Sequence, residues 1–212
     1  MISSIPTDRR FAFVGLKIEF DPHDRVSMEA WFNLAHRVEF LSLDAGSELQ
    51  SQHTSSQFIY FLANGIAREF FVRPNGQETN RAFHRPFTVV GSLDSYKRTV
   101  NNHSNIQLLN SGHVYRLSCQ KLIQLMEQFP ELHTWYRLNV FRTSAQVQNR
   151  LADLLAKKPD QRLTEFVDQS PDLLREVSAH HLANFLDVPS VVVSIVKKRA
   201  LAQTKQIEEA YC

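Results

Sequence analysis

The spacing of turn residues between positions 39 and 118 constrains the fold more than any other feature of the sequence. Short segments rich in β-branched and aromatic residues follow one another here, among them EFLSL, QFIYFLA and IAREFFV. Turn residues separate them, for example DAGS at 44–47 and RPNG at 73–76. Many short strands at intervals of about 8–12 residues are typical of a β-sandwich or barrel. Asn75-Gly76 between two such segments is the strongest hairpin signal in the chain.

The hydrophobic period changes from that of strands to that of helices after Ser118. The segment CQKLIQLMEQF predicts a short helix that ends at Phe129-Pro130, because proline disfavours helical conformation in the residue before it. A long helix over about 131–157 is expected next, with positions along one face recurring at alternating spacings of three and four, as in a coiled coil. These positions are Leu138, Phe141, Ala145, Gln148, Ala152 and Leu155.

A second apolar stripe runs beside this seam. It consists of Val140, Val147, Leu151 and Leu154. A helix with two apolar stripes can pack on its own domain with one stripe and on a partner with the other, so we expect a dimer helix. One broad face packed on a single core is the alternative.

The first 38 residues give a weaker pattern. The segment FAFVGLKIEF predicts a short strand, followed by turn residues in DPHD. From Ser27, which is a suitable N-cap residue, SMEAWFNLAHRV has the spacing of a short amphipathic helix with Trp31, Leu34 and Val38 on one face.

Composition excludes several classes of protein. The 212 residues are 43% hydrophobic and 22% charged, which predicts a folded chain, and the net charge of +2 does not by itself indicate a polyanionic partner. No apolar run approaches the roughly 18 residues of a membrane helix, and no secretory signal is evident. Cys119 and Cys212 are too few for an iron–sulfur cluster and fit a reduced, cytoplasmic protein.

The segment VSAHHLANFLDVPSVVVSIVKKR at 177–199 predicts two short helices around a tight turn. Apolar residues suited to hold the helices together are Leu182, Ala183, Leu186, Val188, Val193 and Val196. Asp187 stands at the turn, where a left-handed conformation is expected, and Asp tolerates that conformation better than most residues do.

The order of these parts resembles the Crp/Fnr superfamily of transcription regulators. The resemblance covers about residues 27–200 and is carried mainly by FIYFLANGIAREFFVRPNGQETNRAFHRPFTVVGSL and KKPDQRLTEFVDQSPDLLREVSAHHLANFLDVPS. It implies an α+β fold: a cyclic-nucleotide-binding-like β-roll (jelly roll), a long dimerisation helix, and a helix-turn-helix domain without a clear wing. The corresponding parts would be residues 1–130, 131–157 and 158–212.

The resemblance also locates a degenerate effector pocket at Gly91, Ser92, Asn102, His103 and Ser104. Relatives place Glu after the glycine and Arg-Ser-Ala further on, so that Arg holds the cyclic phosphate and Glu the ribose. Here Ser92 replaces the Glu, and Asn102-His103-Ser104 replace Arg-Ser-Ala. Losing two charged contacts of about 1.5–3 kcal/mol each would cost about two to four decades in affinity. We expect no cyclic AMP binding in the family's mode, with another small ligand or an empty pocket as alternatives.

The resemblance implies DNA contacts from the second helix of the motif. The expected contact residues are Ser190, Val191, Ser194, Ile195, Lys197, Lys198 and Arg199, with His180 on the first helix. Relatives carry an acidic residue at Val191 and Arg at Ile195; the two apolar residues can contact only thymine methyl groups. Residues 158–212 hold seven basic and eight acidic residues, so the phosphate contacts that DNA affinity depends on would rest on the Lys197–Arg199 cluster.

The prediction is therefore a DNA-binding homodimer that regulates transcription, with a palindromic operator and RNA polymerase as further partner. The alternative is a sensor or interaction protein that keeps the fold and uses Val191 and Ile195 on a protein partner. No catalytic motif occurs, and the histidine spacing does not favour a metal site, so we expect neither an enzyme nor a cofactor. Cys119 is expected to be a packing residue rather than a redox sensor.

Overall fold

The computed structural model describes residues 7–93, 96 and 101–211. Contacts divide the chain into two compact units. The first comprises residues 1–78 and 83–145, and the second comprises residues 79–82 and 146–212. No helix in the described ranges is long and apolar enough to cross a membrane.

Three short helices begin the described chain: α1 (Thr7–Gly15), α2 (Lys17–Phe20) and α3 (Met28–Ala35). The strand predicted for FAFVGLKIEF is therefore wrong. Phe13 and Phe20 are 0% and 2% exposed, and the Phe13 ring stacks on Trp31 with 5.1 Å between ring centroids. Tertiary burial of these rings outweighs their preference for strands. The predicted cap of α3 is confirmed, because the Ser27 side chain accepts a hydrogen bond from the Ala30 amide.

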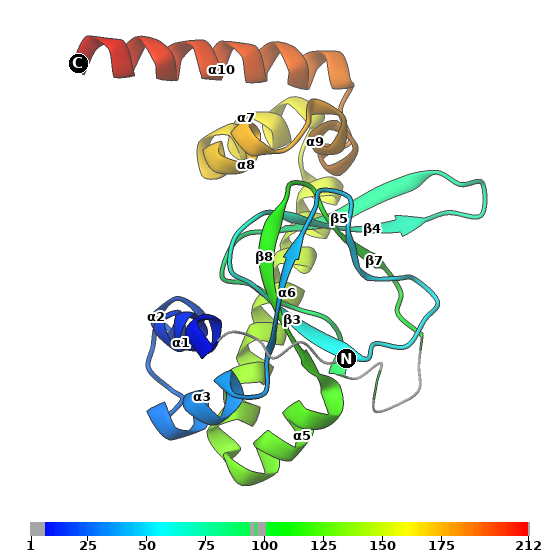
Figure 1. Cartoon of the computed structure of the whole chain (residues 1–212). Coiled ribbons are helices and arrows are strands. Elements are labelled where there is room, and N and C mark those ends of the chain that lie inside the picture. The colour runs from blue at the N-terminus through cyan, green and yellow to red at the C-terminus, as the bar shows by residue number, and fades with distance from the viewer. Residues whose placement is uncertain (1–6, 94–95, 97–100, 212) are drawn as a thin grey trace. The chain divides into compact units, whose positions relative to one another are not determined.

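Eight described strands form the β-roll. They are β1 (Glu39–Leu43), β2 (Glu48–Gln50), β3 (Phe58–Leu62), β4 (Ala67–Val72), β5 (Glu78–His84), β6 (Val89–Val90), β7 (Asn105–Leu108) and β8 (Gly112–Ser118). One sheet has the order β1-β8-β3-β6 and the other β2-β7-β4-β5 (Figure 1). The paired registers are antiparallel. The two-sheet β domain expected from the turn spacing is confirmed, and Asn75-Gly76 does lie between β4 and β5, with Gly76 at φ +80°.

Strand β3 separates two apolar clusters because successive side chains point to opposite faces of a sheet. Ile59 and Phe61 join the cluster that contains Phe13 and Trp31 of the N-terminal helices. Leu62 joins a second cluster, formed with residues of the other sheet such as Leu108. The N-terminal helices are thus part of the main core of the first unit.

Helices follow β8, as expected from the change of period. They are α5 (Cys119–Gln128), α6 (Pro130–Ala156), α7 (Pro159–Gln169), α8 (Pro171–Glu176), α9 (Ala179–Leu186) and α10 (Ser190–Tyr211). The predicted break at Phe129-Pro130 and the predicted long helix are confirmed. Within α6 the buried residues are Leu132, Trp135 and Tyr136, all near its beginning. The indole of Trp135 donates a hydrogen bond of 3.0 Å to the Phe20 carbonyl, which anchors α6 to the N-terminal segment.

The core position of Phe13 gives a direct test of this fold. We expect Phe13→Ala to lower the free energy of unfolding by about 3–5 kcal/mol, because it leaves a cavity among packed aromatic rings. Urea unfolding measures the change. The matched control is Ile18→Ala on the neighbouring helix, where the side chain is 71% exposed and the expected change is within about 0.5 kcal/mol. Equal small losses in both variants would contradict the placement of α1 in the core.

Candidate functional site

Helices α9 and α10 with the turn between them form a helix-turn-helix. The Ser178 hydroxyl caps α9 by accepting a hydrogen bond from the His181 amide. Asp187 has φ 55° and ψ 54°, so the left-handed conformation expected at the turn is confirmed. The Val188 amide then bonds to the Ala183 carbonyl at 3.1 Å, which closes the end of α9.

Apolar contacts hold the two helices against each other. Leu182 and Val193 are 0% exposed, and Ala183 and Leu186 are also buried. Val188 and Val196 are half-buried. The small side chain of Ala183 lets α9 and α10 approach closely, so the six residues expected to hold the motif together take that position.

Two arginines fix the end of α9. The Arg162 guanidinium is 8% exposed and donates to the carbonyls of Leu186 (2.8 Å), Asp187 (3.1 Å) and Lys157 (2.7 Å). Arg150 of α6 donates to the Phe185 carbonyl at 2.7 Å. Burial lowers the pKa of Arg150. No sequence motif marks these residues, because their partners are backbone carbonyls.

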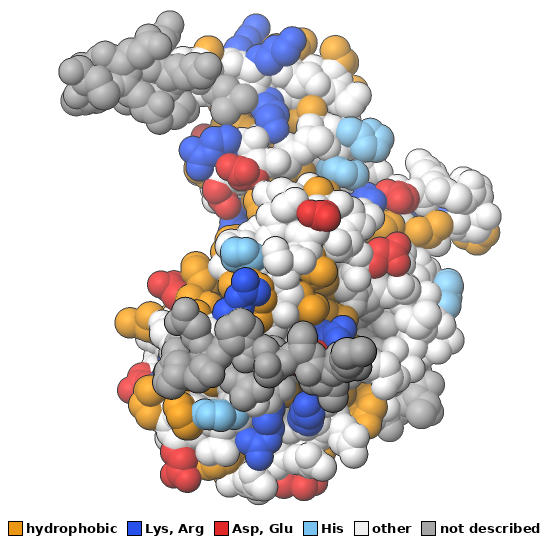
Figure 2. Space-filling view, viewed as in Figure 1, with side chains coloured by type: hydrophobic (Ala, Val, Ile, Leu, Met, Phe, Trp, Pro, Cys, Tyr) orange, Lys and Arg blue, Asp and Glu red, His pale blue; other side chains and the backbone are white. Residues whose placement is uncertain are grey.

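The outward side of the motif combines apolar and basic residues. Val191 is 63% exposed and Ile195 is 47% exposed. Ser190, Lys198, Arg199 and His180 are exposed as well. Figure 2 shows basic side chains beside hydrophobic ones over the first turns of α10. These six expected contact residues therefore lie on accessible surface.

The other two expected DNA contacts are bonded to backbone carbonyls of their own domain. The Ser194 hydroxyl donates to the Ser190 carbonyl at 2.9 Å. The Lys197 ammonium group donates to the Val177 carbonyl at 2.5 Å, and burial lowers its pKa. Lys198 and Arg199 are thus the cations of the KKR cluster that remain directed outward.

In the described part of the chain, the five expected effector residues differ in their surroundings. Gly91 has φ +111°, and a Cβ there would lie 2.9 Å from the Phe58 carbonyl oxygen, so this glycine serves close packing. Ser92 is half-buried and His103 is exposed. Asn102 is buried and accepts a hydrogen bond of 2.8 Å from the Ser56 hydroxyl.

Ser104, the remaining residue of this set, is occupied by an internal polar cluster. Its hydroxyl donates to the Glu69 carboxylate at 2.5 Å, and the other Glu69 oxygen lies 3.3 Å from His84 Nε2. All three side chains are buried. A carboxylate beside Ser104 disfavours a bound phosphate there, because like charges repel strongly where water is excluded.

A half-open cavity of about 230 Å³ lies between the loop that joins β2 to β3 and Asn102. Its lining is mostly neutral and polar: Ser51, Thr54, Ser56, Gln57, Tyr60 and Asn102 are among the lining residues. Burial raises the pKa of Tyr60, which keeps the phenol neutral near pH 7. This lining offers hydrogen bonds to a small ligand, with Glu48 as a charged residue at its edge.

The seam expected on α6 is largely accessible. Phe141 and Leu155 are 70% and 81% exposed, Gln148 and Ala152 are exposed, and Leu138 and Ala145 are half-buried. The second stripe also contains accessible residues, with Val140 at 42% and Leu151 at 56%. Several large apolar side chains are thus exposed along this one helix.

Other reactive groups have structural surroundings. Among the described residues, no group of three or more His, Cys, Asp or Glu side chains is placed to hold a metal ion. Cys119 is 0% exposed, and burial raises the pKa of its thiol to about 11. A thiol in this state does not provide the thiolate that redox sensing needs, which agrees with the packing role expected for Cys119.

No family model and no curated protein matches the chain. Several solved structures are similar to the chain. The c-di-GMP-responsive global regulator CLP of Xanthomonas campestris has a TM-score of 0.67 and 11% identity, over 84% of this chain and 93% of that chain. FixK2 from Bradyrhizobium japonicum has a TM-score of 0.64 and 14% identity, over 81% of this chain and 86% of that chain. The sensor domain of the transcriptional regulator DNR from Pseudomonas aeruginosa has a TM-score of 0.53 and 15% identity, over 70% of this chain and 96% of that chain. These neighbours are Crp/Fnr-family regulators, so the fold that the resemblance implied is confirmed.

Arg162 provides a test of how the motif is held. We expect Arg162→Met to lower the free energy of unfolding of the second unit by at least about 2 kcal/mol, because three backbone carbonyls, one of them buried, lose a charged donor. Hydrogen exchange at the amides of α9 measures the loss locally. Arg175→Met is the matched control, since Arg175 is exposed and its ion pair with Glu176 is worth at most about 1 kcal/mol. Unchanged protection in both variants would refute the clamping role of Arg162.

Proposed function

We propose that this chain is a transcription regulator that binds DNA as a homodimer. The observation that carries the proposal is the helix-turn-helix itself: a capped α9, a left-handed turn at Asp187, and an α10 whose first turns are accessible. The fold shared with the neighbouring regulators supports it. In a two-fold dimer, the two α10 helices would enter successive major grooves about 34 Å apart.

The homodimer would form along α6. Phe141 and Leu155 are the largest exposed apolar side chains of the seam, and full burial of each would contribute about 1.5–3 kcal/mol per protomer. The two positions lie far apart along the helix, so contact with a second α6 would extend over several turns. This surface requires a partner helix with the same apolar pattern, which a second copy supplies.

DNA recognition in this proposal depends on few charges. Lys198, Arg199 and His180 would contact phosphates, which fix the position of the protein without reading sequence. Val191 and Ile195 would contact thymine methyl groups in the major groove. The expected operator is therefore a palindrome with thymines at the positions under these two residues.

Regulation would begin in the first unit and act through α6. The helix is continuous, and its first part belongs to the first unit while its last part belongs to the second. An event at the β-roll that moves α6 would re-aim the two α10 helices. Cyclic AMP bound in the family's mode is not the proposed trigger, because the Ser104 hydroxyl already donates a hydrogen bond to the Glu69 carboxylate. RNA polymerase is the further partner that an activator of this kind would contact.

The exposure of Val191 and Ile195 favours a second candidate function. Two accessible apolar side chains at the tip of a helix could bind a protein instead of DNA. The chain would then be a sensor or interaction protein that retains the fold. Salt dependence separates the two functions, because phosphate contacts release counterions and an apolar protein contact does not.

A selection from fragmented genomic DNA tests DNA binding. We expect the purified protein to recover fragments that share a palindromic sequence at about 50 and 200 mM salt. The double variant Lys198→Gln/Arg199→Gln should weaken binding to all sequences and reduce the salt slope by about two per protomer. The matched control is Lys121→Gln, an exposed lysine in the first unit. Recovery of no common sequence would favour the protein-binding alternative.

Sedimentation equilibrium tests the homodimer. Phe141→Ala should weaken dimerisation by about two to three decades, because about 2 kcal/mol of burial is lost from each of two protomers. Phe32→Ala is the control, since Phe32 is also exposed, at 42%, but lies on α3. A Phe141→Ala protein that remains as dimeric as the unmodified chain would rule out this seam.

A further inference from the structure

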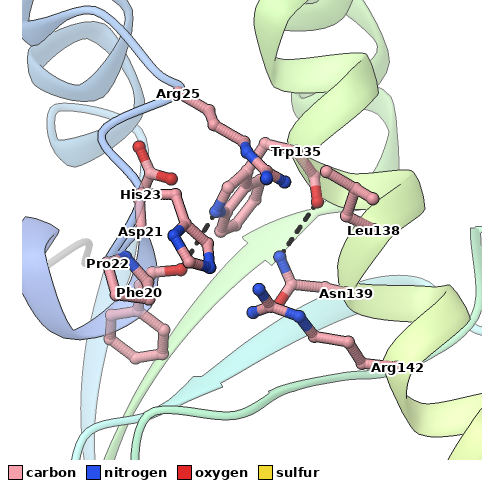
Figure 3. Close-up of a pocket in the computed structure, with 9 residues that line it drawn as sticks. All are labelled: Phe20, Asp21, Pro22, His23, Arg25, Trp135, Leu138, Asn139 and Arg142. Carbon is pink, nitrogen blue, oxygen red and sulfur yellow. Dashed lines mark hydrogen bonds between the residues drawn. The ribbon is translucent and has the colours of Figure 1, made fainter.

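A narrow crevice lies in the first unit between the turn after α2 and the middle of α6. Its lining residues are Phe20, Asp21, Pro22, His23, Arg25, Trp135, Leu138, Asn139 and Arg142. Figure 3 shows the side chains of Arg25, His23 and Arg142 converging on it from two separate segments. The crevice has a volume of about 10 Å³, which is room for about one water molecule.

The wall of the crevice is fixed before any ligand binds. The Asp21 carboxylate accepts a hydrogen bond of 2.8 Å from the Val26 amide, and the Lys17 ammonium group bonds to Asp21 and Asp24. Trp135 and Asn139 hold the opposite side: Trp135 bonds to the Phe20 carbonyl, and the Asn139 amide donates to the Trp135 carbonyl (Figure 3). Arg25 thus extends from the turn after α2 and Arg142 from α6, and hydrogen bonds hold both segments in place.

The charges at the crevice are unbalanced. Both carboxylates of the turn, Asp21 and Asp24, are paired with Lys17. Within the described part of the chain, Arg25, His23 and Arg142 have no hydrogen-bonding or ion-pair partner. Arg25, Arg142 and Lys17 carry three positive charges against the two negative charges of Asp21 and Asp24. The site therefore has an excess of one positive charge before His23 is counted, which favours an anion.

The seam of α6 passes beside this crevice. Leu138 lines the crevice and is also the first seam position, and Arg137 and Arg142 occupy the positions that flank the seam at this level. In a parallel pair of helices the flanking positions face each other across the interface. Residues 132–152 contain three arginines and no acidic residue, so a second copy of α6 brings no carboxylate to offset them.

We propose that this crevice binds a polyvalent, phosphate-bearing small molecule, and that its charge stabilises the dimer. One phosphate oxygen would enter the crevice, and the rest of the anion would remain at its mouth between Arg25, His23 and Arg142. The coupling to dimerisation rests on the proposed homodimer. Binding itself uses residues of one protomer and does not depend on it.

Inorganic pyrophosphate is a suitable probe, compared with chloride at matched ionic strength. Calorimetry measures its binding and sedimentation equilibrium measures the dimer constant. We expect pyrophosphate to bind and to strengthen dimerisation beyond the effect of chloride. Arg25→Gln should weaken binding about tenfold or more, because one charged contact is lost, and should leave the dimer constant in chloride unchanged.

Arg142→Gln separates the two parts of the proposal. It should also weaken pyrophosphate binding, but it should strengthen the dimer in chloride because one repelling charge per protomer is removed. Arg37→Gln is the matched control, since Arg37 is bonded to Asn33 and lies outside the crevice; both measurements should stay unchanged. If chloride and pyrophosphate act alike at equal ionic strength and no binding heat appears, the anion site is refuted while a dimer remains.

A monomer under all conditions that still binds pyrophosphate, with binding lost in Arg25→Gln, would uphold the site and refute the homodimer. A monomer that binds no pyrophosphate would overturn both proposals. Binding that Arg25→Gln and Arg142→Gln leave unchanged would place the anion elsewhere and overturn the crevice.

Discussion

The contact between Trp135 and the N-terminal segment is the interaction on which the rest of the first unit depends. Its indole bonds to the Phe20 carbonyl and lies edge-on to Trp31, with 5.9 Å between centroids. Trp31 stacks on Phe13, and Phe13 packs edge-on against Phe61 of β3. A single aromatic cluster therefore joins the N-terminal helices, the sheet and α6. Past Tyr136 the helix has no buried residue, so its apolar side chains remain accessible.

A different kind of interaction holds the second unit. Arginine side chains bond to the backbone carbonyls at the end of α9, which would otherwise lack partners. Guanidinium groups suit this role because they carry several donors in a fixed plane and cannot lose their charge. The turn at Asp187 is thereby held from two helices, α6 through Arg150 and α7 through Arg162. The orientation of α9 and of the turn before α10 thus depends on arginines whose partners are backbone carbonyls.

The sequence predicts well those features that depend on local chemistry. Asn75-Gly76, Phe129-Pro130, Ser27 and Asp187 each require a particular backbone conformation, and each lies where the pattern placed it. The segment FAFVGLKIEF was predicted wrongly because its phenylalanines are placed by distant partners, Trp31 and Phe61. Arg150 and Arg162 could not be found for a similar reason: their partners are carbonyls, which any sequence supplies.

The polar residues at the expected effector site show why sequence position alone does not define a pocket. Asn102 and Ser104 stand two residues apart where the chain bends before β7, and they bond to different neighbours, Ser56 and Glu69. Each of these bonds satisfies a buried polar group inside the protein, so a ligand that used the same group would have to break the bond. A ligand at Ser104 would have to compete with a buried carboxylate, whereas the cavity beside Asn102 already offers free volume and neutral hydrogen-bonding groups. Asn102 and Ser104 thus take part in internal hydrogen bonds that stabilise the roll.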